Sequence, residues 1–244
     1  MKKYLSLSLE KAVQWPLVLC GFLLLSACDD VNCIKGNGDV KQRTLTLQPF
    51  SEIEANGDFK VYITQGEPQR VEVKGESNIL SDLNTQVRNG KWEIEHESCV
   101  RRSDPVEVYI ILPEVEALYL NGSGRIYSEN KLVVDELPVQ VNGSGVVDLE
   151  VDASKVILRV TGSGEALLSG TTDIQTINMS GSGTAATSNL AAEDVTVNLS
   201  GSGEAEVRAS KSLTVDISGS GKVYYYGNPT VNSNISGSGK LVKR

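Results

Sequence analysis

The feature that most constrains the fold is the tripeptide Gly-Ser-Gly, which recurs through the second half of the chain. Its seven copies begin at Gly122, Gly143, Gly162, Gly181, Gly201, Gly219 and Gly237, at intervals of 18 to 21 residues. A period of this length is typical of solenoids, in which each unit buries its apolar face by stacking on its neighbours. Gly and Ser are also linker residues, so the flanking residues must decide between the two interpretations.

The six residues before each of the last six copies alternate in polarity. At the sixth, fourth and second places before the first glycine, 16 of 18 residues are apolar, the exceptions being Gln175 and Ser233. At the intervening places 16 of 18 are polar, the exceptions being Pro138 and Ile157. Such alternation indicates a β-strand with one buried face, and a linker has no reason to show it.

Each repeat therefore predicts a strand, a bend at Gly-Ser-Gly, a second short strand and a polar turn. We expect an all-β fold, a right-handed parallel β-helix with coils of 18 to 21 residues. Propeller blades of the WD40 or kelch type need roughly 40 to 50 residues, which disfavours a propeller. An antiparallel sandwich or barrel remains the alternative.

Counting by twos along a coil places both glycines of each tripeptide inside and the serine outside. Inward glycines would leave a wall without side chains, where the backbone can bend sharply. The predicted outward row consists of Ser123, Ser144, Ser163, Ser182, Ser202, Ser220 and Ser238.

Residues 44–121 carry the same pattern in a less regular form. Residues 55–61 align with residues 120–126, and Asn89-Gly90 between two short alternating runs predicts a tight hairpin. The end of a solenoid needs an atypical unit that covers the core and blunts the open strand edge. We expect degenerate coils and a partly antiparallel N-terminal cap over 44–121, and regular coils over 122–244.

The first 27 residues have the layout of a secretory signal peptide. Lys2 and Lys3 precede an apolar run over 15–25, which is too short to cross a ~30 Å bilayer core. The run ends in Leu25-Ser26-Ala27-Cys28, which resembles the bacterial lipobox and implies that an acylated Cys28 anchors the mature chain to a membrane. We expect a lipid-anchored protein of the bacterial cell envelope, periplasmic or surface-exposed. A plain signal peptide is the alternative.

A polar tether is expected over residues 28–43, which contain glycine and show no apolar period. Once Cys20 is removed with the signal peptide and Cys28 is acylated, Cys33 and Cys99 remain. Two thiols in an exported chain indicate one disulfide. Two free or buried thiols are the alternative.

Residues 50–61, the Gln65-Gly66 turn that follows them and the repeated Gly-Ser-Gly together carry a family resemblance. The chain resembles the auto-transporter adhesin head domains, also called head GIN domains, of exported bacterial proteins. The resemblance covers residues 45–244 and implies a β-helical fold with an adhesive or surface role. The family supplies no accepted catalytic residues.

Charge and composition argue against several functions. The formal net charge is -8, which would repel a phosphate backbone, so we expect no nucleic-acid partner. His96 is the single histidine, and the chain has no CxxC or HExxH motif, so we expect neither a metal nor another cofactor.

Acidic residues keep an enzyme among the alternatives. Asp148, Glu150 and Asp152 lie close together, and Glu165 and Glu204 take the same place in non-adjacent coils. Glycosidases use two carboxyl groups, so a polysaccharide-processing lyase or glycosidase-like enzyme on a β-helix is the alternative function. Solvated acidic residues on an outer face would give the same pattern, and we favour that interpretation.

The sequence thus predicts a non-catalytic, membrane-anchored envelope lipoprotein whose rigid surface serves adhesion or binding. A glycan or a protein surface is the expected ligand, and the oligomeric state is left open. Tyr224 and Tyr226 are expected to be exposed, either as an aromatic contact for a sugar ring or as a plain edge patch. Ice binding by the serine row is disfavoured, because such faces usually carry threonine methyl groups.

Overall fold

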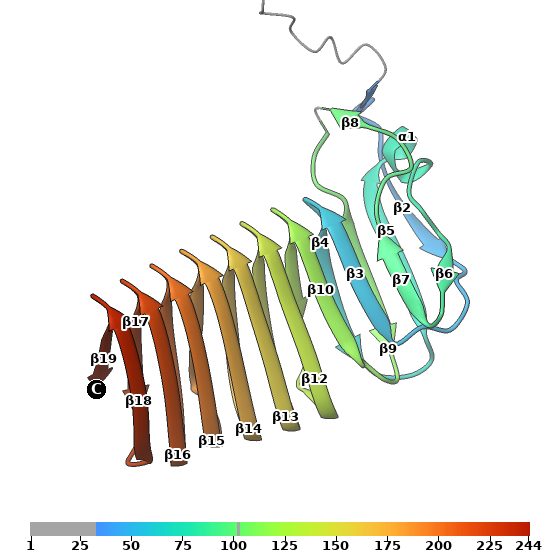
Figure 1. The fold of residues 1–244 in the computed structure, drawn as a ribbon. Helices are drawn as coiled ribbons and strands as arrows, with labels where there is room; N and C mark the ends of the chain where they lie inside the picture. Colours follow the sequence, from blue (N-terminus) through green and yellow to red (C-terminus); the bar gives the residue numbers. More distant parts are fainter. Residues whose placement is uncertain (1–32, 102) are drawn as a thin grey trace, which may run out of the picture. The chain divides into compact units, whose positions relative to one another are not determined.

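The computed structural model describes residues 33–101 and 103–244. Within them the chain forms a β-solenoid of about seven turns, with a curled mixed sheet at its N-terminal end (Figure 1). Neighbouring strands of the regular coils pair in parallel, as between residues 146–162 and 165–181. The predicted parallel β-helix is confirmed, and the sandwich or barrel is wrong. No helix in this part of the chain has the length and apolar character needed to cross a membrane.

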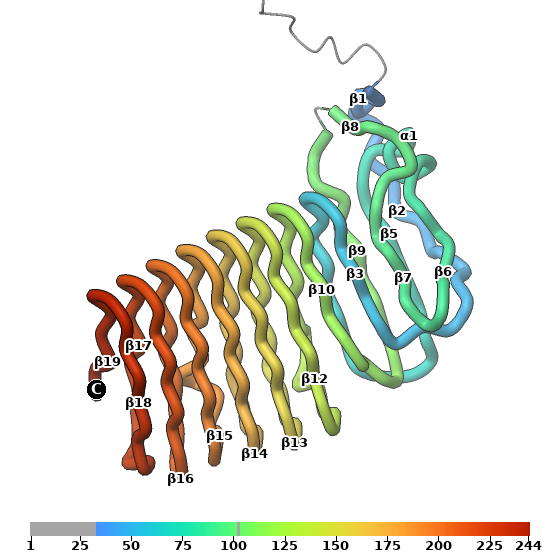
Figure 2. Tube along the Cα trace, in the orientation of Figure 1, coloured from blue at the N-terminus to red at the C-terminus, as the bar shows by residue number. Residues whose placement is uncertain are grey.

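Ten strands build the regular coils, through which the chain winds in Figure 2. They are β10 (Ala117–Gly122), β11 (Arg125–Ser128), β12 (Leu132–Gly143), β13 (Val146–Gly162), β14 (Glu165–Gly181), β15 (Thr184–Gly201), β16 (Glu204–Gly219), β17 (Lys222–Tyr226), β18 (Thr230–Gly237) and β19 (Lys240–Lys243). Each long strand contributes to two sheets. The start of β13 pairs with β11, whereas its end pairs with the end of β12. We call these the post-bend sheet and the pre-bend sheet, because their residues follow or precede a Gly-Ser-Gly bend.

The bends stack in register along the solenoid. The first glycine of each tripeptide pairs with the first glycine of the next coil, from Gly122 to Gly237. At each step a serine N–H donates to the glycine carbonyl of the preceding coil, as from Ser182 to Gly162 at 2.9 Å. The Gly-Ser-Gly segments are therefore hydrogen-bonded parts of the sheet and not linkers.

The first glycine does not lie inside the core as expected. The second glycine, such as Gly183, is buried, but Gly181 is exposed. Its φ of 116° lies in the region that L side chains rarely adopt, and this conformation interrupts the inside–outside alternation. A Cβ on Gly181 would also lie 2.5 Å from the carbonyl oxygen of Gly162. Backbone conformation and close stacking, and not an inward wall, therefore require glycine here.

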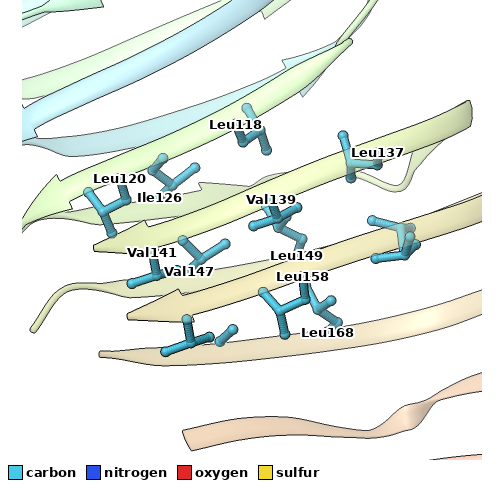
Figure 3. Packing of buried hydrophobic residues seen from close by; sticks show 14 of the residues in the cluster. Leu118, Leu120, Ile126, Leu137, Val139, Val141, Val147, Leu149, Leu158 and Leu168 are labelled. Atoms are coloured by element: carbon cyan, nitrogen blue, oxygen red, sulfur yellow. The ribbon is translucent and has the colours of Figure 1, made fainter. Parts of the chain in front are cut away.

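Apolar side chains from the two sheets meet in one continuous core (Figure 3). Leu118, Val139 and Leu158 stack in the pre-bend sheet, and Val147 and Leu149 face them from the post-bend sheet. Each of these side chains is at most 1% exposed. Stacked coils bury what a single coil would leave in water, so burial favours the stack.

A buried side-chain amide interrupts this core. Gln175 is 0% exposed, and neither its Nε2 nor its Oε1 has a hydrogen-bond partner within the described part of the chain. Its neighbours in register are Val156 and Val195. An unpaired buried amide lowers the free energy of unfolding by about 1–3 kcal/mol. Gln175, an exception to the apolar pattern of the sequence, is therefore also destabilising.

A cap of short elements closes the N-terminal end. It contains β2 (Val40–Leu45), β3 (Glu52–Gly57), β4 (Lys60–Gln65), β5 (Arg70–Glu76), α1 (Ser77–Leu80), β6 (Val87–Arg88), β7 (Lys91–Ile94) and β9 (Glu107–Leu112). The pairs β2–β5, β5–β9 and β6–β7 are antiparallel. The partly antiparallel N-terminal cap is thus confirmed.

Chain order and spatial order differ at this end. β3 and β4 pair with β10 and β11 on one side, and with β7 and β9 on the other. The coil formed by β3 and β4 precedes the others in the sequence, but in space it lies between β7 and β9 on one side and β10 and β11 on the other. Its register places Ala55 beside Leu120 and Val61 beside Ile126, as the alignment of the two segments predicted.

The folded unit begins earlier than the expected tether allowed. It starts at Cys33, so residues 33–43 of the proposed tether 28–43 belong to the domain. They form β1 (Ile34–Lys35) and most of β2, which pairs with β5. Every residue of β2 except Leu45 is exposed. Backbone hydrogen bonds hold this edge strand, and for that reason no apolar period marks it in the sequence.

We expect Gly181→Ala to lower the free energy of unfolding by at least about 2 kcal/mol. The new Cβ would stand at a positive φ and against the Gly162 carbonyl, and both effects are destabilising. The matched change Ser182→Ala removes only an exposed hydroxyl and should cost less than ~0.5 kcal/mol. Urea denaturation of the two variants measures the difference. Equal losses would show that the bend is not tightly packed.

We expect Gln175→Leu to raise the free energy of unfolding by about 1–2 kcal/mol, because it removes an unpaired amide at similar volume. Thermal and urea denaturation measure the change, with the neighbouring outward substitution Thr176→Leu as the control. A destabilised Gln175→Leu variant would mean that the amide has a partner, such as a bound water.

Candidate functional site

The outer surface of the pre-bend sheet repeats a short polar pattern. In β14 the residues five, three and one places before the first glycine are Thr176, Asn178 and Ser180. β15 repeats Thr, Asn and Ser at these places, and β16 has Thr, Asp and Ser. The register stacks equivalent residues, so each place forms a row along the solenoid axis. The intervening Ile177 and Met179 are buried, which turns the polar residues outward.

Hydrogen bonds between coils fix the amide side chains of these rows. Asn198 Nδ2 donates to Asn178 Oδ1 at 3.0 Å, and Asn234 Nδ2 donates to Asp216 Oδ1 at 3.2 Å. Each Nδ2 has two hydrogens, so one remains for a ligand. The amides are therefore held in place before any ligand arrives.

A second amide ladder lies nearer the cap, in the row next to the bend. Asn142 donates to Asn121, and Asn121 donates to Asn56, both at 2.8 Å. Asn121 also donates to Glu54 Oε1 at 2.9 Å. This ladder crosses the boundary between the regular coils and the cap, which ties the two together.

A shallow trough of about 390 Å³ runs along the pre-bend sheet. One wall is the row next to the bend, formed by Thr161, Ser180, Ser200, Ser218 and Ser236. The other wall is the row two residues earlier, formed by Arg159, Asn178, Asn198, Asp216 and Asn234. One cation and one anion make the walls neutral overall. The trough crosses five coils and is the candidate functional site.

The predicted serine row lies beside this trough. All seven serines, Ser123, Ser144, Ser163, Ser182, Ser202, Ser220 and Ser238, are exposed at the bends. None of them lines the trough, whose serines come from the place just before the first glycine. Sequence reasoning singled out the serine at the bend and missed the trough. The signal for it is the amide that recurs three places before the glycine, as at Asn178 and Asn198.

Tyr224 and Tyr226 are partly buried beneath arginine side chains. The guanidinium carbon of Arg244 lies 3.8 Å from the ring centroid of Tyr224, and that of Arg208 lies 5.3 Å from the centroid of Tyr226. Arg244 also pairs with Glu206 at 3.0 Å. The two cations cover ring faces on which a sugar would stack.

Three other tyrosines form a stack on the post-bend sheet that sequence reasoning missed. The Tyr62 ring centroid lies 4.9 Å from that of Tyr109 and 5.4 Å from that of Tyr127, with nearly parallel planes. Burial raises the pKa of Tyr62, and burial together with the hydrogen bond to Glu107 raises the pKa of Tyr109 to about 12. The sequence does carry a signal for this stack, because Tyr62 and Tyr127 directly follow the two aligned segments. Stacked rings join the cap to the first coils.

The acidic residues are spread over the outer surface. Asp148, Glu150 and Asp152 alternate along β13 and are exposed. Glu165 and Glu204 both neighbour Thr184 in register, so one coil separates them. Across residues 33–101 and 103–244, no group of three or more His, Cys, Asp or Glu is placed to hold a metal ion.

The remaining predicted sites lie at the N-terminal end. His96 packs against Phe59 with 4.9 Å between ring centroids, and burial lowers the pKa of the imidazole. Cys33 and Cys99 are joined by a disulfide beside the short parallel ladder of β1 and β8 (Val100–Arg101). Cys28 lies outside the described residues.

Comparison with known proteins gives a family and a set of similar folds. The family model described as "Putative auto-transporter adhesin, head GIN domain" matches residues 49–229. No curated protein sequence matches the chain.

Several solved structures share the fold. A "putative adhesin" from Bacteroides fragilis is 24% identical, with a TM-score of 0.82 over 86% of this chain and 100% of that one. A "putative lipid binding protein" from Parabacteroides distasonis is 23% identical, with a TM-score of 0.72 over 87% and 100%. A "putative adhesin" from Parabacteroides merdae is 18% identical, with a TM-score of 0.71 over 86% and 98%. At these identities the likeness shows the fold.

Proposed function

Because the chain belongs to the family described as "Putative auto-transporter adhesin, head GIN domain", we propose that it is a non-catalytic adhesion module of the bacterial cell envelope. The observation that carries the proposal is the polar face of the pre-bend sheet, with its trough across five coils. Two of the similar solved structures carry the description "putative adhesin", which supports the same role.

The face suits weak contacts repeated along a line. Equivalent positions recur at each coil, and Asn or Ser fills seven of the ten that form the walls, so a repeating ligand can make the same contact several times. Linked contacts of this kind bind far more strongly than any one of them. The amide ladder holds Asn178 and Asn198 in place, which lowers the entropy lost on binding.

Membrane anchoring through acylated Cys28 belongs to the same proposal. Leu25-Ser26-Ala27-Cys28 supports it, and only residues 29–32 separate Cys28 from the folded domain at Cys33. Five peptide units span at most roughly 18 Å, so an anchored domain would begin close to the membrane. The same motif supports placement in the cell envelope.

We expect the full chain, produced in a bacterium, to be recovered from membranes as a protein that begins at an acylated Cys28. Intact mass spectrometry of the membrane fraction measures both features. The variant Cys28→Ser should lack the added acyl mass. An unmodified Cys28, or cleavage at another residue, would contradict the lipid anchor.

We expect the purified full chain to bind at least one ligand on an array of glycans and matrix proteins without cleaving it. A reducing-end assay on the same ligands measures cleavage. New reducing ends that disappear in Glu150→Gln or Asp148→Asn, at unchanged melting temperature, would replace the adhesion module with an enzyme. Failure to bind any arrayed ligand would contradict the adhesive role itself.

A further inference from the structure

We propose that the trough on the pre-bend sheet binds a single extended chain of a neutral polysaccharide, laid parallel to the solenoid axis. This inference rests on the proposed adhesive function and names the chemical class of its ligand. The two walls, the row of Thr161 and Ser180 and the row of Arg159 and Asn178, carry it.

The width of the trough selects a single narrow chain. Asn178 and Ser180 stand two residues apart on one strand, so the Cα atoms that carry the two walls lie about 7 Å apart. An α-helix with its side chains is about 10–12 Å across and does not fit between them. An extended sugar chain can instead lie along the trough with its hydroxyl groups over both rows.

The length and period of the trough select a polymer. Its walls repeat once per coil over five coils, which is about 19 Å at the ~4.8 Å spacing of neighbouring strands. In an extended β-1,4-linked chain, one sugar advances by a length close to this spacing. Successive sugars can therefore meet equivalent side chains, such as Asn178 and then Asn198.

The chemistry of the walls matches hydroxyl groups. Amides and hydroxyls each donate and accept hydrogen bonds, as sugar hydroxyls do. Arg159 and Asp216 are the charged residues of the walls, so the net charge of the walls is zero. The chain as a whole has a formal charge of -8, so a polyanion would be repelled.

An extended peptide fits the trough less well. Peptides that add to a sheet pair with an open strand edge, through backbone hydrogen bonds. The floor of the trough is formed by Met179, Leu199 and Ile217, in the interior of the sheet. Their strands already pair with a coil on each side, as Met179 does with Val160 and Leu199. Among the strands that line the trough, β18 alone has an unpaired edge, and a peptide added to that edge would run along the strand, across the end of the trough and not within it.

The test is calorimetric titration of the full chain, in detergent micelles, with oligosaccharides of defined length. The neutral probes are cellohexaose and mannohexaose, the short probe is cellobiose, and the anionic probe is hexagalacturonic acid. We expect at least one neutral hexasaccharide to bind, cellobiose to bind at least about tenfold more weakly, and the anionic probe not to bind.

Two trough variants and one matched control locate the site. Asn178→Ala with Asn198→Ala removes two amides and should weaken binding by about tenfold or more. Ser200→Trp leaves the amide ladder intact, fills the trough and should abolish binding. The control, Asn189→Ala with Asn232→Ala, removes two exposed amides outside the trough and should bind within about twofold of the parent chain. Melting temperatures confirm that each variant is folded.

Three results would overturn the inference. They are no binding of either neutral hexasaccharide, binding that both trough variants retain, or preferential binding of hexagalacturonic acid. If the array still shows binding in these cases, the adhesive function stands and only the ligand class is wrong. If the array shows no binding to any ligand, the adhesive function fails as well.

Discussion

The close backbone stacking at the Gly-Ser-Gly bends sets the geometry of the whole solenoid. The N–H of Ser182 donates to the carbonyl of Gly162 at 2.9 Å, and the same bond recurs at the other bends. A Cβ on Gly181 would come within 2.5 Å of that carbonyl oxygen, so only glycine allows the contact. Because every bend is alike, the strands on both sides leave in the same register.

That register connects the core to the surface. Inward residues of successive coils stack between the two sheets, where Val139 and Leu158 are nearly inaccessible to water. Outward residues stack into rows, and the amides of Asn178 and Asn198 come within hydrogen-bonding distance. The trough lies between two such rows, so its straight walls follow from the same constraint as the core.

Local periodicity predicts the coils, their parallel pairing and the alignment of residues 55–61 with 120–126. It does not predict the outward first glycine, because counting by twos assumes extended backbone and Gly181 has a positive φ. The sequence also does not predict that β3 and β4 lie between β7 and β9 on one side and β10 and β11 on the other, since the pattern within a coil does not specify which coil stacks on it. The sequence pattern does not predict strand β2, because β2 buries almost no apolar surface. The sequence pattern does not predict the trough, because outward Asn and Ser residues cannot be distinguished from ordinary solvated positions.

Hydrogen exchange at the bends tests this account most directly. The amide hydrogens of Ser163, Ser182 and Ser202 each bond to a glycine carbonyl of the preceding coil. Measured by NMR, they should exchange as slowly as the amide of the buried strand residue Ile177. Exchange at the rate of an unstructured Gly/Ser linker would show that the bends are not held by stacking, and the account would be wrong.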